Sequence, residues 1–152
     1  MNPYDPQKAA RVWQRVQTQQ QESRPEGDLQ ALMMEKRHTA AIYAQLARQL
    51  LGKESPILQR LHREEQSHTA CLRGICTLIA GDAPIVPTPP IPKDPPELTL
   101  RKCYAREMRS LKEYESRMSD PEYGPVFARL AAQEREHCRA VLELIGGLGK
   151  KA

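Results

Sequence analysis

Two eleven-residue stretches decide the fold: RLHREEQSHTA at residues 60–70 and RLAAQEREHCR at residues 129–139. Both begin with Arg-Leu, and both carry a Glu-x-x-His word at the same distance from it, at residues 65–68 and 134–137. Residues three apart lie on one face of an α-helix. Each word falls within an apolar helical stripe, so each stretch is expected to direct a carboxylate and an imidazole into a core. The pair predicts a metal site built by two related halves.

The composition favours a single helical domain. The chain has 152 residues, only 5% of them aromatic, and is rich in Ala, Leu, Gln, Glu and Arg, which favour helices over sheets. The net charge of +4 is spread over interspersed signs without a basic block, so nucleic-acid binding is not indicated. No apolar run is long enough to span a membrane and the N-terminus is polar. A cytoplasmic protein is the expectation.

The cysteines give no sign of a metal ribbon. Cys71, Cys76, Cys103 and Cys138 form no C-x-x-C pair, which excludes a rubredoxin or zinc-ribbon module. We expect all four to be reduced thiols that pack in the core.

The chain divides into an N-terminal helix with its linker at residues 1–27 and a four-helix bundle at residues 28–148. The N-terminal helix is expected over residues 5–21, with Trp13 anchoring it to the bundle. Seven prolines within residues 81–97 forbid a regular helix there and indicate an extended crossover. The predicted fold is all-α, with two helical hairpins joined by this crossover. The bundle helices are expected at residues 28–51, 56–80, 96–118 and 121–145, the last closed by Gly146 and Gly147.

Each predicted helix carries a carboxylate near the middle of its apolar stripe. An ionised carboxylate in a bundle core costs several kcal/mol unless it is paired. Four carboxylates repel one another, whereas two divalent ions would cancel their charge and accept imidazole nitrogens as well. The six candidate ligands are Glu35, Glu65, His68, Glu107, Glu134 and His137.

A single Glu-x-x-His word in a charged helical protein usually marks a solvated face, and only the pairing of two words favours metal. Neighbouring acids that fall off the stripes, Glu64 and Glu136, are interpreted as surface charges. His62 is interpreted as a polar residue flanking its stripe.

This arrangement resembles the ferritin-like di-iron proteins, and most of all the di-iron domain of rubrerythrin, over residues 29–146. The resemblance implies a ferritin-like four-helix bundle that holds two Fe ions, with Mn or Zn as alternatives, on the six residues above. Glu65 and Glu134 would bridge the ions or chelate one of them. Tyr114 matches a tyrosine that hydrogen-bonds a ligand carboxylate at the active site, with Tyr43 as its partner.

The chain also departs from that family. It lacks a rubredoxin domain, and Ser110 stands where rubrerythrin has a further Glu. Glu35 lies about sixteen residues before its turn and Glu65 about ten after it, so at ~1.5 Å per residue their heights differ by several ångströms. His38 is the alternative donor on that helix. The N-terminal helix and the proline-rich crossover are also foreign to the family pattern.

The resemblance implies a protein that reacts with hydrogen peroxide or oxygen, in oxidative stress or iron handling, with electrons from a separate donor protein. A homodimer is the expected assembly. Two alternatives stay open: a metal-binding or storage protein without turnover, and a structural helical assembly protein with a degenerate site.

Overall fold

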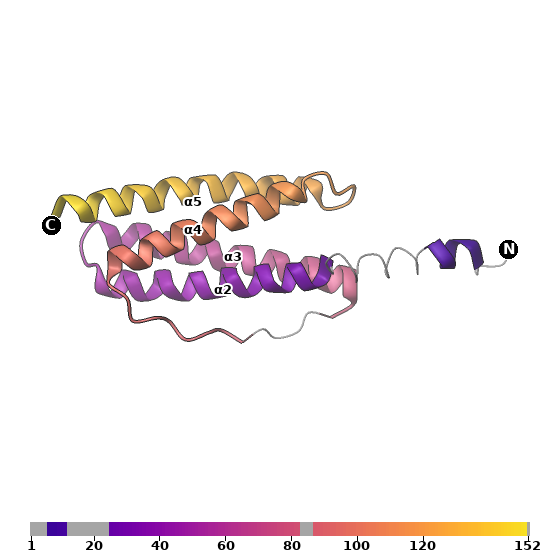
Figure 1. Cartoon of the computed structure of the whole chain (residues 1–152), viewed down its shortest axis with the longest axis horizontal. Coiled ribbons are helices and arrows are strands. Elements are labelled where there is room, and N and C mark those ends of the chain that lie inside the picture. Colours follow the sequence, from indigo (N-terminus) through magenta and orange to yellow (C-terminus); the bar gives the residue numbers. More distant parts are fainter. Residues whose placement is uncertain (1–5, 12–24, 83–86, 152) are drawn as a thin grey trace.

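The computed structural model describes residues 6–11, 25–82 and 87–151, and these residues form helices joined by turns and one extended segment (Figure 1). The all-α prediction is confirmed for this part of the chain. Residues 6–11 are helical, while Trp13 and most of the expected N-terminal helix lie outside the described residues. The remaining helices are α2 (Pro25–Gln49), α3 (Glu54–Ala80), α4 (Pro96–Ser116) and α5 (Gly124–Lys151).

The helices form two hairpins. α2 packs along α3 and α4 packs along α5, as the sequence predicts. α3 ends and α4 begins at opposite ends of the bundle, and residues 87–95 lie alongside α2 and lead to the start of α4 (Figure 1). α3 and α4 therefore run in the same direction, and each hairpin can present its buried face to the other.

A glycine ends α3, and a serine in its first turn ties it to α2. Gly81 adopts a left-handed conformation (φ +80°) after the last helical residue, and its N–H donates to Thr77 O. That end was predicted. At the other end Ser55 lies inside the helix, and its Oγ donates to Ala47 O at 2.8 Å. Ser55 therefore ties α3 to α2, and the helix begins at Glu54, two residues before the predicted start at residue 56.

The last helix is longer than predicted. α5 begins at Gly124, after a turn in which Asp120 Oδ1 accepts the N–H groups of Glu122 and Tyr123. It continues through Gly146 and Gly147 instead of closing there. A helical glycine costs about 1 kcal/mol relative to alanine. Leu148 is partly buried against the core, and this packing favours the continued helix.

A polar layer divides the core into two apolar clusters. One cluster lies toward the α4–α5 turn and includes Leu32, Leu72 and Phe127. The other lies toward the α2–α3 turn and includes Leu46, Leu61 and Val141. On each of the four helices, the buried residues of this polar layer lie between residues of the first cluster and residues of the second. The members of the polar layer are Lys36, Glu65, His68, Glu107, Glu134 and His137.

No disulfide joins the four cysteines within the described residues; Cys76, Cys103 and Cys138 are buried and Cys71 is half-buried, as expected of residues that pack in the core. Within the described residues, no helix combines the length and apolar character that a bilayer crossing requires.

Candidate metal centre

The polar layer is completely buried. Lys36, Glu65, His68, Glu107 and Glu134 are each 0% exposed, and His137 is 1% exposed. The four helices of the bundle all contribute: α2 gives Lys36, α4 gives one glutamate, and α3 and α5 each give a Glu-x-x-His word. The structure thus brings together five of the six predicted ligands and adds a lysine that sequence reasoning missed.

Lys36 lies at the centre of this layer. Its Nζ is 2.7 Å from Glu134 Oε1, 3.1 Å from Glu65 Oε2 and 3.5 Å from Glu107 Oε1. One ammonium group therefore contacts all three buried carboxylates. A metal ion was expected to supply positive charge at this place, and the chain supplies part of it from its own side chain.

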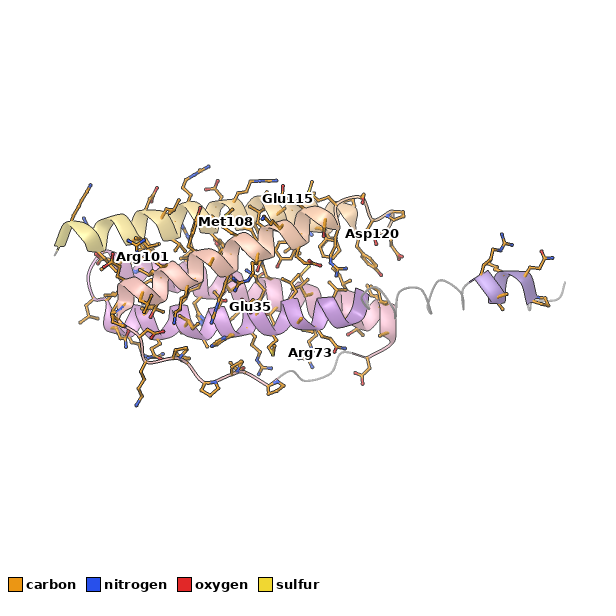
Figure 2. The ribbon with its side chains drawn as sticks, viewed as in Figure 1. Glu35, Arg73, Arg101, Met108, Glu115 and Asp120 are labelled. Atoms are coloured by element: carbon orange, nitrogen blue, oxygen red, sulfur yellow. The ribbon has the colours of Figure 1, made fainter. Side chains whose placement is uncertain are left out.

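Glu35 is not part of the cluster. Its carboxylate is 30% exposed and pairs with Arg109 at 3.2 Å and with Arg106 at 3.7 Å. Glu35, labelled at the middle of α2 in Figure 2, therefore belongs to a surface ion pair with α4. The prediction that it lies on the core-facing stripe is wrong, because the next residue, Lys36, takes the inward position.

His38, the alternative donor on α2, does not join the cluster either. It is 8% exposed, and its Nδ1 lies 3.2 Å from Nη1 of Arg106. His62 is half-buried with Nδ1 2.8 Å from Ala40 O, which fits its interpretation as a polar flank residue.

The two histidines of the words are held in the same manner. Nδ1 of His137 faces the centre, 3.1 Å from Glu65 Oε1 and 3.2 Å from Glu107 Oε2, while its Nε2 lies 2.7 Å from Glu64 Oε2. Nδ1 of His68 also faces the centre, 3.0 Å from Glu134 Oε1. An outer partner fixes the orientation and tautomer of an imidazole, and so prepares its other nitrogen to bind a metal.

The outer partner of His68 is Gln133, whose Oε1 lies 2.7 Å from Nε2. Gln133 and Glu64 each stand immediately before the glutamate of a Glu-x-x-His word. Each therefore anchors the histidine of the opposite helix. Glu64 was interpreted as a surface charge, and although its side chain is 39% exposed, it has this inner contact. The polar residue immediately before each Glu-x-x-His word was the sequence signal that could have identified Glu64 and Gln133 as the outer partners of the two histidines.

Two buried tyrosines complete the surroundings. Tyr43 donates from its hydroxyl to Glu107 Oε1 at 3.2 Å. The Tyr114 hydroxyl lies 3.2 Å from His68 Nδ1, so the contact of Tyr114 is with an imidazole, whereas the resemblance implied a carboxylate. Neither hydroxyl faces water, and both orient groups of the polar layer.

Burial and charge give these groups unequal proton affinities. Burial alone lowers the pKa of Lys36, but the three carboxylates outweigh it and hold that pKa well above its usual range. Burial raises the pKa of Glu107, but Lys36 and hydrogen bonds from its neighbours hold it well below the ordinary value. Burial and the nearby Glu107 raise the pKa of Glu65 to about 7, and burial raises that of Glu134 well above its ordinary value.

The two histidines respond in opposite directions. Burial, with the charges of Lys36 and His137, lowers the pKa of His68 to about 4. For His137, burial acts downward, but hydrogen bonds to Glu107 and Glu65 raise the pKa to about 11. Without a metal, His137 is therefore an imidazolium at neutral pH, and protons remain on the carboxylate set.

The donors suit one divalent ion. Glu65, Glu107, Glu134 and His137 each offer a ligating atom, and these atoms lie within 4.8 Å of one another. Glu134 Oε2 is buried without a hydrogen-bond donor from the described residues. A second set on the His68 side would need a fourth donor from α2, and the residue there is Lys36, a cation. The cluster could thus hold a metal ion, and its residues do not fit a symmetric pair.

Comparisons of the chain with protein-family models, with curated proteins and with solved structures gave no significant match.

Proposed function

We propose that this chain is a metal-binding protein that holds a divalent transition-metal ion in the middle of its helical bundle. The observation that carries the proposal is the convergence of four buried donor atoms, from Glu65, Glu107, Glu134 and His137, within 4.8 Å of one another. Carboxylates combined with one imidazole suit iron or manganese, with zinc as the alternative. When bound, such an ion would supply Lewis acidity and, for iron or manganese, a redox couple.

Charge supports this proposal. Three carboxylates buried in an apolar core are unfavourable unless cations balance them. Lys36 contacts all three, but one ammonium balances only one of them. In the absence of metal, the remainder is met by protons and by the imidazolium of His137. A divalent ion would replace those protons, as expected for a site whose ligands must be deprotonated to bind.

The residues around the four donors also favour metal binding, because they hold the donors in place and keep water out. Tyr43 holds Glu107, Glu64 holds His137, and the two apolar clusters exclude water on either side. Two hairpins with a long crossover and a charged layer at mid-height are what we expect of a ferritin-like protein of the rubrerythrin type. We extend the proposal to that family, with iron as the natural metal and iron handling as the role.

Metal titration tests the proposal. Chelated protein is titrated anaerobically with Fe²⁺ or Mn²⁺, and bound metal is measured by elemental analysis after gel filtration. Glu107→Gln replaces a ligating carboxylate with a neutral amide and is expected to weaken binding by roughly a hundredfold. Glu97→Gln, a change on the exposed first turn of the same helix, is the control and should bind as the wild type does. Wild-type protein that retains no metal would overturn the proposal.

A second candidate function is the reduction of hydrogen peroxide or the activation of oxygen at an iron-loaded site. The observation that favours it is a recess of about 300 Å³ between α2 and α4, lined by Ser110 one turn from Glu107. Ser110 Oγ is buried and makes no hydrogen bond within the described structure. The recess would bring a small oxidant against Ser110, one helical turn from Glu107.

Peroxide consumption tests this second function. Reduction of hydrogen peroxide to two waters takes two electrons and two protons, and the electrons would come from a separate donor protein. Iron-loaded wild type supplied with a chemical reductant should consume peroxide. Ser110→Val removes the hydroxyl and narrows the recess beside Glu107, and should slow consumption about tenfold or more at unchanged iron content. Equal rates for the two proteins would exclude this route.

A further inference from the structure

The two hairpins carry a common register that extends beyond the Glu-x-x-His words. Leu29, Lys36, Thr39 and Tyr43 on α2 stand at the same spacings as four residues of α4. The α4 residues are Leu100, Glu107, Ser110 and Tyr114. All eight are buried. Each leucine and each tyrosine falls in the opposite apolar cluster from its counterpart, as expected for antiparallel copies.

This register equates Lys36 with Glu107. In the second hairpin, Glu107 lies 3.2 Å from Nδ1 of His137, the histidine of its own hairpin. In the first hairpin, the equivalent position holds a lysine, and the nearby His68 has Tyr114 and Glu134 as its neighbours. The fold therefore contains two equivalent half-sites for metal, one in each hairpin. The second has the carboxylate of Glu107 beside its histidine, and the first has the ammonium group of Lys36 at that position.

Formal charge agrees with this assignment. One divalent ion together with one ammonium cancels three carboxylates when both histidines are neutral. Two divalent ions beside Lys36 would leave an excess of two positive charges in a fully buried layer, which is strongly unfavourable.

We infer that Lys36 acts as a built-in substitute for the second metal ion, so that the centre binds one ion, on the Glu107 and His137 side. This inference rests on the proposed metal-binding function and specifies its stoichiometry. Lys36 thereby separates this chain from any protein that holds a metal pair on four glutamates and two histidines.

The test is the number of ions bound by three proteins. Wild type, Lys36→Glu and Lys36→Met are stripped with chelator and titrated anaerobically with Mn²⁺ in a calorimeter, and metal content is then measured by elemental analysis. Wild type should bind one equivalent. Lys36→Glu completes four glutamates and two histidines and should bind two. Lys36→Met removes the cation without adding a ligand, and should stay at one equivalent.

The outcomes separate the two proposals. Two equivalents in wild type would overturn the role of Lys36 and leave metal binding standing. Zero equivalents in wild type would overturn metal binding, and the inference with it. Lys36→Glu that stays at one equivalent would also overturn the inference. Because the wild-type result decides by itself, poor folding of a variant does not remove the test. Electron paramagnetic resonance of the Mn²⁺ form gives a second readout, an isolated ion in wild type and a coupled pair in Lys36→Glu.

Discussion

The α2–α3 hairpin and the α4–α5 hairpin place equivalent residues in the same buried layer but give them opposite electrostatics. In the second hairpin, Glu107 is held ionised and His137 protonated. In the first, Lys36 is held as a cation and His68 neutral. Two differences separate the otherwise similar halves: Lys36 stands opposite Glu107 in register, and the outer partner of His137 is Glu64 whereas that of His68 is Gln133. A repeated scaffold can thus hold a charge pattern that is far from symmetric.

The largest expected effect comes from removing the cation of the first half. Lys36→Met leaves three buried carboxylates without their ammonium partner, and we expect it to lower the free energy of unfolding of the metal-free protein by about 3–5 kcal/mol. Urea denaturation in the presence of chelator measures it. Adding a divalent ion should recover part of the loss, because the ion supplies the missing charge.

Lys102→Met on α4 is the matched control. Lys102 is 52% exposed and pairs with Asp94 at 2.8 Å, so its replacement should change stability by less than about 1 kcal/mol. Similar losses for the two lysines would contradict the central position of Lys36.

The pH behaviour of the two histidines is the second way to test the comparison. In the metal-free protein, His137 should stay protonated well above pH 8, and His68 should stay neutral down to about pH 5, given pKa values of about 11 and about 4. Imidazole ¹⁵N chemical shifts followed against pH measure both. Two histidines that titrate together near pH 6.5 would contradict the asymmetry.

The directions of the two pKa shifts also determine how the stability of the metal-free protein depends on pH. The pKa of His137 is raised on folding, so its contribution is full below about pH 6.5 and is lost as pH rises toward about 11. The pKa of His68 is lowered, so its contribution is present above about pH 6.5 and is lost as pH falls toward about 4.

The polar layer also shows which parts of the site could be predicted from the sequence. The two Glu-x-x-His words predicted Glu65, His68, Glu134 and His137 as one buried cluster, and Glu107 with them. The inward residue of α2 was missed because that helix buries a broad face: Leu32 and Met33 are both buried, as are Ile42 and Tyr43. Periodicity alone cannot choose between neighbouring positions on such a face. Glu35 was chosen because a carboxylate near the middle of the helix matched the pattern of the other three stripes.

The extent of α5 could not be predicted either. Gly146 and Gly147 are weak helix residues, and a local rule ends the helix before them. What extends it is the packing of Leu148 against the core, a tertiary contact that local sequence does not encode.

Tyr43 and Tyr114, which stand at equivalent positions of α2 and α4, allow a test of the charge difference between the two halves with a smaller expected effect. Tyr43→Phe removes a hydrogen bond to an ionised carboxylate and should cost about 2 kcal/mol, whereas Tyr114→Phe removes one to a neutral imidazole and should cost about 1 kcal/mol. Denaturation of the two variants under the same conditions measures the difference. The reverse order would mean that Glu107 is not the more strongly charged partner.

The smallest expected effect concerns the outer partners of the histidines. Glu64→Gln gives His137 the same kind of neutral partner that Gln133 gives His68. Because Glu64 is partly exposed, stability should change by less than about 1 kcal/mol. The pKa of His137 should fall, as ¹⁵N shifts would show, and metal affinity should drop about tenfold. An unchanged pKa would show that Glu64 does not contribute to holding the proton.

The most direct test of the central claim is the position and number of metal ions in the folded protein. Crystals of Mn²⁺-loaded wild type, measured at a wavelength where manganese scatters anomalously, should show one peak. It should be bonded to His137 Nδ1 and Glu107, with the ammonium of Lys36 still against Glu65 and Glu134. Two peaks flanking the bridging glutamates, with Lys36 displaced from the layer, would contradict the account, as would the absence of any peak among these residues.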